Sequence, residues 1–312
     1  MALVVVRPGT FATVQDRGRP GHRRFGVPVG GAADVGSYLL ANALLGNPPD
    51  AAALELTLLG GTYRAEVDLP LALAGAPMPA VVEPPAGAGP PRPWPIPGTG
   101  TLRAGEALVL GGAPAGARCY LAVRGGWQAP LVLGSRSTET SLRAGDRLDA
   151  RPGTITARRP SPALLAAFGP PLDPAAPLRW LPGPDFDPAS PRLDGPYRVL
   201  AQSSRVGLRL DGPPIPTTAP PDRPSMPVAP RAVQVAGGQP ILLGVAGGTI
   251  GGYAHVAHVV AADLDRLGQL RPGDPVRFAP APTPLDHARH LDAVRRAAHR
   301  RWIARLLIWA DA

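Results

Sequence analysis

The sequence predicts a mainly β protein with two β-modules, a few short helices and a C-terminal helix. Three observations support this prediction. The 312 residues include 38 Gly and 43 Pro, which interrupt short apolar runs along the whole chain. Apolar residues make up 45% of the chain, enough for a sizeable core. Such a density of helix breakers excludes long helical bundles and favours many short strands joined by turns.

Nine short apolar runs have the character of strands, because most are bounded by Gly, Pro or Asp. We predict strands at residues 3–6, 11–14, 54–58, 69–73, 107–110, 119–123, 241–245, 256–260 and 276–278.

Three helices are predicted between these runs. The first covers residues 34–45, where Asp34 can cap the N-terminus, apolar residues recur at helical spacing and Gly46 ends the helix. The second covers residues 262–270. The third begins at Leu285, with Trp302, Leu306 and Trp309 on its apolar face and Arg on the other.

The predicted organisation follows the distribution of proline. Residues 1–160 form an N-terminal β-module that contains the helix at 34–45, and residues 161–196 form a Pro-rich connection. Residues 197–280 form a C-terminal β-module, and residues 281–312 form the basic amphipathic helix. A Leu-Arg-Ala/Pro-Gly-acid pattern at 102–106, 142–146 and 270–274 is compatible with two similar modules.

Charge and composition exclude several classes of function. There are 32 Lys+Arg against 23 Asp+Glu, which gives a net charge of +9, and the printed sequence contains no Lys. Without Lys, the chain has no P-loop, Schiff-base or lysine-base chemistry. The Arg residues are scattered, so we expect a solvated basic surface and no nucleic acid.

The single Cys119 cannot form an internal disulfide and lies in an apolar run, which indicates a buried structural thiol. Without a leader or membrane span, we expect a cytoplasmic protein.

The densest polar cluster lies at residues 13–21, where Gln15, Asp16, Arg17 and Arg19 follow a predicted strand among glycines. Arginine forks suit carboxylate or phosphate, and an Asp can orient an Arg or accept a proton. The alternative interpretation is a turn stapled by an Asp–Arg pair.

Two further loops could bind a ligand. In the first, Ser135, Ser137 and Thr138 flank Arg136 after a strand and a glycine, as in an anion-binding loop; an exposed turn is the alternative. In the second, residues 247–253, glycines surround Thr249 and end at Tyr253, which is compatible with either a glycine-lined cleft or a simple turn. This second loop lacks dinucleotide-binding spacing.

The histidines give no metal motif. His255 and His258 are three residues apart in a predicted strand, so we expect them on opposite faces. His287 and His290 share a helical face but have no third ligand at a recognised spacing. We therefore predict no metal site.

These motifs, taken in order, resemble the allophanate hydrolase subunit 2-like proteins, which include the biotin-dependent carboxyltransferase region of urea amidolyase, the C component of bacterial 5-oxoprolinase and the KipA-type regulators. The resemblance rests on residues 13–19, 26–28, 31–34, 41–42, 46–47, 52–55, 118–126, 132–138, 204–212, 239–253, 262–264 and 272–274.

The resemblance implies a cyclophilin-like β-barrel architecture and an allophanate hydrolase subunit 1-like partner, of the type of the 5-oxoprolinase B component or KipI. It also implies a possible further partner that resembles the 5-oxoprolinase A component. The corresponding activity is ATP-dependent opening of 5-oxoproline to L-glutamate, with ATP bound at the level of the complex. Biotin would have to arrive on another protein, because the chain has no lysine to carry it.

We predict site residues on this basis. Asp16 and Arg136 are the candidate catalytic residues. The candidate ligand-binding residues are Gln15, Arg17, Arg19, Ser135, Ser137, Thr138, Arg205, Thr249 and Tyr253.

The chain departs from the family pattern at Val206, where the family commonly carries Met, and in five further places. These are Gly30, Ser204, Met226, Ala246 and Gly248, where the family commonly carries Ser, Asn, Glu, an acidic residue and Gln. The departures leave two alternatives open beside the enzyme component: a non-catalytic KipA-type regulatory partner, and a biotin-dependent carboxyltransferase-like subunit.

Overall fold

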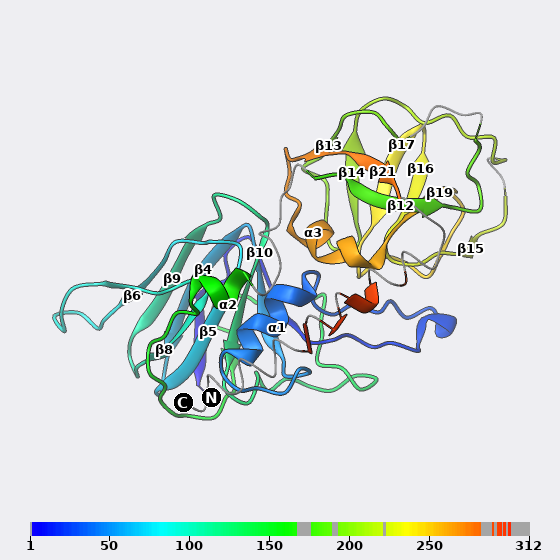
Figure 1. Cartoon of the computed structure of the whole chain (residues 1–312). Coiled ribbons are helices and arrows are strands. Elements are labelled where there is room, and N and C mark those ends of the chain that lie inside the picture. The colour runs from blue at the N-terminus through cyan, green and yellow to red at the C-terminus, as the bar shows by residue number, and fades with distance from the viewer. Residues whose placement is uncertain are drawn as a thin grey trace. The chain divides into compact units, whose positions relative to one another are not determined.

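The chain divides into two compact units (Figure 1). Unit 1 comprises Met1–Gly18, Asp34–Pro171 and Ala298–Ala312, and unit 2 comprises Arg19–Ala33 and Leu172–Ala297. The computed structural model describes residues 2–166, 176–188, 193–220, 223–281, 289, 292–294, 296–297 and 299–300. Residues 19–33 come early in the sequence but belong to the unit that the second half of the chain builds.

Unit 1 contains two antiparallel sheets, with strand orders β11-β1-β4-β9-β6-β7 and β2-β3-β10-β5-β8. The first sheet consists of β1 (Leu3–Arg7), β4 (Leu59–Ala65), β6 (Ala80–Glu83), β7 (Arg92–Pro93), β9 (Ala107–Gly112) and β11 (Arg147–Leu148). The second consists of β2 (Phe11–Gln15), β3 (Ala53–Thr57), β5 (Leu69–Gly75), β8 (Gly98–Leu102) and β10 (Arg118–Val123).

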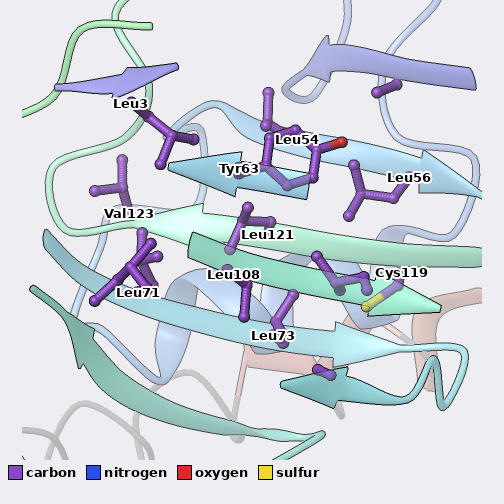
Figure 2. Packing of buried hydrophobic residues seen from close by; sticks show 14 of the residues in the cluster. Leu3, Leu54, Leu56, Tyr63, Leu71, Leu73, Leu108, Cys119, Leu121 and Val123 are labelled. Atoms are coloured by element: carbon purple, nitrogen blue, oxygen red, sulfur yellow. The ribbon is translucent and has the colours of Figure 1, made fainter. Parts of the chain in front are cut away.

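Strand alternation builds the core of unit 1. Leu54 and Leu56 of β3 and Leu121 of β10 contribute to one buried cluster (Figure 2). Successive side chains of a strand point to opposite faces, so the residues between them face away from this cluster. Cys119 belongs to the same cluster and is a free thiol, which confirms the structural interpretation. Burial raises the pKa of Cys119 to about 12, so the thiol stays protonated and unreactive.

Helix α1 (Val35–Ala43) forms where the sequence predicts a helix at 34–45. The Asp34 carboxylate caps its N-terminus by accepting hydrogen bonds from the Ser37 amide (2.9 Å) and the Ser37 hydroxyl (2.6 Å). Tyr38 packs against Tyr120 of β10 with ring centroids 6.0 Å apart. The helix therefore covers the face of β10 that points away from the core.

Unit 2 is a near-closed barrel with the strand order β20-β13-β14-β17-β16-β19-β12-β21. Only Arg277 separates β20 from β21, yet they pair with opposite ends of the sheet, which brings the two edges together. The strands are β12 (Leu178–Pro182), β13 (Tyr197–Val199), β14 (Gly207–Asp211), β16 (Ala232–Ala236), β17 (Gln239–Leu243), β19 (Ala254–Val259), β20 (Pro275–Val276) and β21 (Phe278–Pro280). The prediction of a mainly β fold is confirmed.

Several shorter elements complete the described residues. They are η1 (Arg23–Phe25), α2 (Pro162–Ala166), β15 (Met226–Pro227), β18 (Ile250–Gly251), η2 (Ala261–Asp263) and α3 (Leu264–Gln269). The last two form the helix predicted at 262–270. Strands β15 and β18 pair as a ribbon separate from the barrel sheet. Of the predicted C-terminal helix, residues 285–288 and Trp302, Leu306 and Trp309 lie outside the described residues. No described helix is long and apolar enough to cross a bilayer.

Several strands were not expected from the sequence, among them β6, β8, β13, β14 and β16. The stretch 161–196, expected as a connection, contains β12, because Leu178 and Trp180 face the barrel core despite the surrounding prolines. Strand β4 has no sequence signal because Gly60 interrupts it. A Cβ added at Gly60 would lie 2.3 Å from the Cβ of Leu110, so close packing against β9 requires glycine there.

The expectation that His255 and His258 face opposite ways is wrong. Their ring centroids lie 5.8 Å apart. In the register between β16 and β19, Val233 pairs with Ala257 while the next residue, Gln234, pairs with His255. Val256 is therefore the extra residue of a β-bulge, which returns both histidines to one face.

Candidate functional site

The candidate site in unit 1 joins the end of β2 to the loop that follows residue 130. Val132 and Ser135 exchange backbone hydrogen bonds (2.8 and 3.2 Å), which closes a tight turn with Leu133 and Gly134 at positive φ. The Thr138 amide donates to the Val14 carbonyl (2.9 Å), which ties the loop to β2. Asp16 and residues 135–138 are therefore held next to each other.

Asp16 is the centre of this cluster. Its Oδ1 accepts hydrogen bonds from the Ser135 hydroxyl (2.6 Å), the Ser137 hydroxyl (2.7 Å) and the Gly18 amide (2.7 Å). Its Oδ2 accepts one from the Arg136 amide (2.6 Å). The residue is only 5% exposed. Four donors engage this buried carboxylate, so its geometry suits holding the loop in place.

Gln15 completes the contact between β2 and the loop. Its Nε2 donates to the Thr138 carbonyl (2.7 Å) and to the Thr13 hydroxyl (2.9 Å). Its Oε1 is buried and has no partner among the described residues. Gln15 therefore holds the C-terminal end of the same loop at Thr138, and its Oε1 remains an unused acceptor among the described residues.

The two candidate guanidinium groups of this cluster differ in exposure. Arg136 is half-buried and donates from Nη1 to the Ala129 carbonyl, which orients its side chain along its own loop. Arg17 follows Asp16 directly and is exposed. Arg17 is thus the charged group of this cluster that solutes can reach most easily, and Arg136 offers the remaining donors of an oriented fork.

The other candidate residues belong to unit 2. Arg205 is buried, and its Nη2 donates to the Gly31 carbonyl (2.7 Å). The Gly30 amide donates to the Val245 carbonyl (3.0 Å), and the Arg19 amide donates to the Val29 carbonyl (2.8 Å). Residues 19–33, which we call the arm, thus form part of unit 2, and Arg205 helps to hold the arm.

Thr249 and Tyr253 lie in the glycine-rich loop beside β18. The Thr249 carbonyl accepts from the Val228 amide (2.9 Å), and the Tyr253 carbonyl accepts from Nη2 of Arg223 (2.7 Å). The Tyr253 side chain is exposed. A Cβ added at Gly244, which precedes this loop, would lie 2.1 Å from the Arg205 carbonyl oxygen. That glycine is explained by close backbone packing and requires no ligand.

Six of the seven candidate residues of unit 1 are linked by hydrogen bonds in one cluster. The seventh, Arg17, is exposed and adjoins the cluster as the neighbour of Asp16 in the chain. The structure does not group Arg19, Arg205, Thr249 and Tyr253 with them, because these four belong to the other unit. The departures from the family pattern, Gly30, Ser204, Val206, Met226, Ala246 and Gly248, also all lie in unit 2.

Sequence reasoning missed a buried polar network under α1. Glu55 accepts a hydrogen bond from the Tyr120 hydroxyl (2.7 Å) and pairs with Nε of Arg118 (3.3 Å). The Tyr120 hydroxyl in turn accepts from the Asp34 amide (2.9 Å). Burial and the Glu55 charge raise the pKa of Tyr120 well above its usual value. The signal in the sequence was a glutamate inside the apolar run of β3.

A second polar group missed from the sequence surrounds His255 in unit 2. Asp185 accepts from Nη1 of Arg223 (2.7 Å) and from the His255 amide (2.7 Å). Burial lowers the pKa of His255, and it lowers that of His258 to about 4, with Arg231 and His255 as smaller causes. Within the described part of the chain, no three His, Cys, Asp or Glu residues gather as metal ligands.

Comparison with known proteins places these units in one family. Residues 25–280 match the carboxyltransferase domain, subdomain A and B. The chain belongs to this carboxyltransferase family. It is 35% identical to the C component of the Escherichia coli 5-oxoprolinase, over 88% of the chain and 90% of that protein. It is also 30% identical to the urea amidolyase of Lachancea kluyveri, over 89% of the chain but only 17% of that protein.

Two solved structures share the fold of this chain. The crystal structure of TTHA0988 superposes with a TM-score of 0.77 at 35% identity, over 89% of this chain and 55% of that one. The Kluyveromyces lactis urea amidolyase superposes with a TM-score of 0.80 at 26% identity, over 96% of this chain and 20% of that one. This chain therefore spans about half of TTHA0988 and a fifth of that amidolyase.

Proposed function

We propose that the chain is the C-type component of a heteromeric, ATP-dependent 5-oxoprolinase, which opens 5-oxoproline to L-glutamate. The observation that carries this proposal is the extent of the match. The chain corresponds to the bacterial C component over 90% of that protein's length, whereas it corresponds to only 17% of the Lachancea urea amidolyase. A match of this extent suits a C-type component that works with an allophanate hydrolase subunit 1-like partner.

In this proposal the unit 1 cluster binds the carboxylate of the substrate or a phosphorylated intermediate. Arg17 and Arg136 supply the guanidinium donors, because a planar fork matches an oxyanion. Asp16 was a candidate catalytic residue, but its carboxylate already accepts four hydrogen bonds. Its role in the proposal is therefore to position the loop that carries Arg136.

The printed sequence has no lysine, so it can neither carry covalently attached biotin nor place a P-loop lysine on a nucleotide phosphate. We therefore propose that ATP binds on another polypeptide of the complex, and that any biotin is supplied by another protein. The contribution of this chain is to bind and orient an anionic group.

Reconstitution tests the proposal. We expect the purified chain to release no glutamate from 5-oxoproline and ATP. The mixture with its subunit 1-like partner and a partner that resembles the 5-oxoprolinase A component should release it. The Arg17→Ala variant should raise KM for 5-oxoproline about tenfold or more, because a charge-assisted contact contributes about 1.5–3 kcal/mol. Its melting temperature should stay unchanged, because Arg17 is exposed.

A matched control for that variant is Arg209→Ala, since Arg209 is also exposed but belongs to unit 2. It should leave KM unchanged. Turnover by the isolated chain, or an unchanged KM in Arg17→Ala, contradicts the proposal for the site.

The departures favour a second candidate, a non-catalytic regulatory partner of the KipA type. All six lie in unit 2, and two of them, Ala246 and Gly248, replace side chains that could contact a ligand. Under this alternative the chain binds its subunit 1-like partner tightly, but the assembled proteins release no glutamate. A carboxyltransferase-like subunit would instead require a biotin-carrying protein for activity in the same assay.

A further inference from the structure

Unit 2 exposes four large apolar or aromatic side chains around η1 and the β15–β18 ribbon. The exposed fractions are 67% for Phe25, 65% for Ile250, 54% for Tyr253 and 48% for Met226. We call these four residues the ribbon surface. A folded protein rarely leaves several such side chains together in water unless they bind something.

Hydrogen bonds join the three segments that carry the ribbon surface. Met226 pairs with Gly251, and Pro227 pairs with Ile250, which places β15 beside β18. Arg23 of η1 donates from Nη2 to the Val228 carbonyl, directly after β15, and to the Gly248 carbonyl (3.4 Å), before β18. The tip of the arm therefore lies against the ribbon, within unit 2.

The ribbon is held in place before any partner arrives. Arg223 donates from Nε to the Gly252 carbonyl (3.0 Å) and from Nη2 to the Tyr253 carbonyl (2.7 Å). Asp185 fixes the same guanidinium through Nη1 (2.7 Å). A preorganised surface loses little conformational entropy on binding, so more of its contact energy appears as affinity.

The charges beside the ribbon surface are positive and one donor is unused. Nη1 of Arg23 is buried and has no acceptor among the described residues, and burial lowers the pKa of Arg23. The Arg24 guanidinium lies 4.7 Å from the centre of the Phe25 ring. Asp185 is already committed to Arg223. Arg24 is exposed, so its guanidinium can pair with a carboxylate of a docking partner.

We propose that the ribbon surface docks an acidic and apolar segment of the subunit 1-like partner. Aromatic side chains, Met and Arg are the residues that protein interfaces favour at their centres. A second copy fits poorly, because an isologous contact would bring Arg23 and Arg24 against each other in a chain of net charge +9. TTHA0988 continues well beyond the half that this chain matches, so a relative of this fold does occur with further polypeptide.

This inference rests on the proposed function for the identity of the partner. Its test is a binding titration of the full-length chain with the purified subunit 1-like protein, at low and high salt. We expect Ile250→Ser and Phe25→Ser each to weaken Kd at least tenfold, and Arg24→Glu to weaken it further and reduce its salt dependence. Leu59→Ser is the matched control, since Leu59 is 46% exposed but belongs to unit 1. It should bind as the unchanged chain does.

The outcomes separate the two proposals. If the unchanged chain does not bind the subunit 1-like protein, the proposed function and the docking surface both fail. If it binds, but the Ile250 and Phe25 variants bind equally well, only the docking surface fails. A self-association of the unchanged chain in size exclusion that Ile250→Ser abolishes would also overturn the inference, because the occupant would then be a second copy.

Discussion

A single buried carboxylate organises the loop that carries the candidate anion-binding arginine. Asp16 lies at the end of β2, and its four donors come from its own turn and from residues 135–137. Hydrogen bonds to an ionised acceptor are roughly twice as strong as neutral ones. The loop can therefore stay ordered although Leu131 and Val132, at its tip, are exposed.

Replacing Asp16 with Ala should destabilise unit 1. The Ser135 and Ser137 hydroxyls would remain buried without their acceptor, at a cost of at least about 2 kcal/mol. For a unit of this size that corresponds to a fall in Tm of roughly 4–8 °C in calorimetry. Asp50→Ala is the control, because Asp50 is exposed, and its Tm should not move. Equal Tm values for both variants would show that the Asp16 cluster does not hold the loop.

At the scale of elements, the loop between β17 and β18 contains two glycines whose surroundings differ. A Cβ at Gly244 would collide with the Arg205 carbonyl oxygen at 2.1 Å, whereas a Cβ at Gly248 would meet nothing closer than 3.5 Å. The first glycine is required by packing. The second has room for a side chain, so its identity is not explained by sterics.

We expect Gly244→Ala to destabilise unit 2 by about 3 kcal/mol, because backbone on both sides must shift to accept the methyl group. Gly248→Ala is its matched control in the same loop and should change stability by less than about 0.5 kcal/mol. Urea unfolding followed by tryptophan fluorescence measures both. A Gly248→Ala variant as unstable as Gly244→Ala would show that this loop packs differently.

The burial of His258 in β19 makes the stability of unit 2 depend on pH. The folded state lowers the pKa of His258 to about 4, from 6.5 in the unfolded chain, mainly through burial and also through Arg231 and His255. As the pH falls below 6.5, His258 becomes protonated in the unfolded chain while it stays neutral in the folded chain. Stability therefore declines between about pH 6.5 and 4, by on the order of 2–3 kcal/mol.

Comparing the chain with His258→Gln tests this dependence. The variant should lose less stability than the unchanged chain between about pH 7 and pH 4.5, because Gln does not titrate. The measurement is the free energy of unfolding in urea at each pH. Parallel pH profiles for the two proteins would mean that His258 does not cause the decline.

At the scale of the whole molecule, the chain does not fold as two consecutive halves. The arm, residues 19–33, belongs to unit 2 although the sequence on both sides of it belongs to unit 1. Arg205 and Gly31, whose hydrogen bond helps to hold the arm, are 174 positions apart in sequence. Such a contact forms only after a long loop has closed.

Replacing Arg205 with Met should loosen the arm. The variant removes a buried charged donor from the Gly31 carbonyl, at a cost of about 1.5–3 kcal/mol, while it keeps most of the side-chain volume. We expect trypsin to cleave after Arg23 and Arg24 at least tenfold faster than in the unchanged chain, as measured by mass spectrometry. Arg198→Met, at an exposed position of unit 2, is the control and should leave cleavage in the arm unchanged.

Much of the local structure could be read from the sequence because its causes are local. Short apolar runs predict β3 and β10, Asp34 marks the start of α1, and Cys119 lies in an apolar run that must be buried. The cluster of polar residues around Asp16 and the loop 134–140 were both visible as motifs. The sequence does not show that both motifs meet at the Asp16 carboxylate, because Asp16 and Ser135 are 119 positions apart.

The sequence by itself determined the β class, the first helix, the polar motifs and part of the strands, among them β1, β2, β3, β5, β9, β10, β17 and β19, because periodicity, caps and breakers act over a few residues. Tertiary structure alone decided which strands close the barrel, where the arm belongs and which way His255 faces. Closure depends on the single residue between β20 and β21, and the histidine pair depends on one extra residue in β19. Both are matters of register, which is fixed only when distant strands pair.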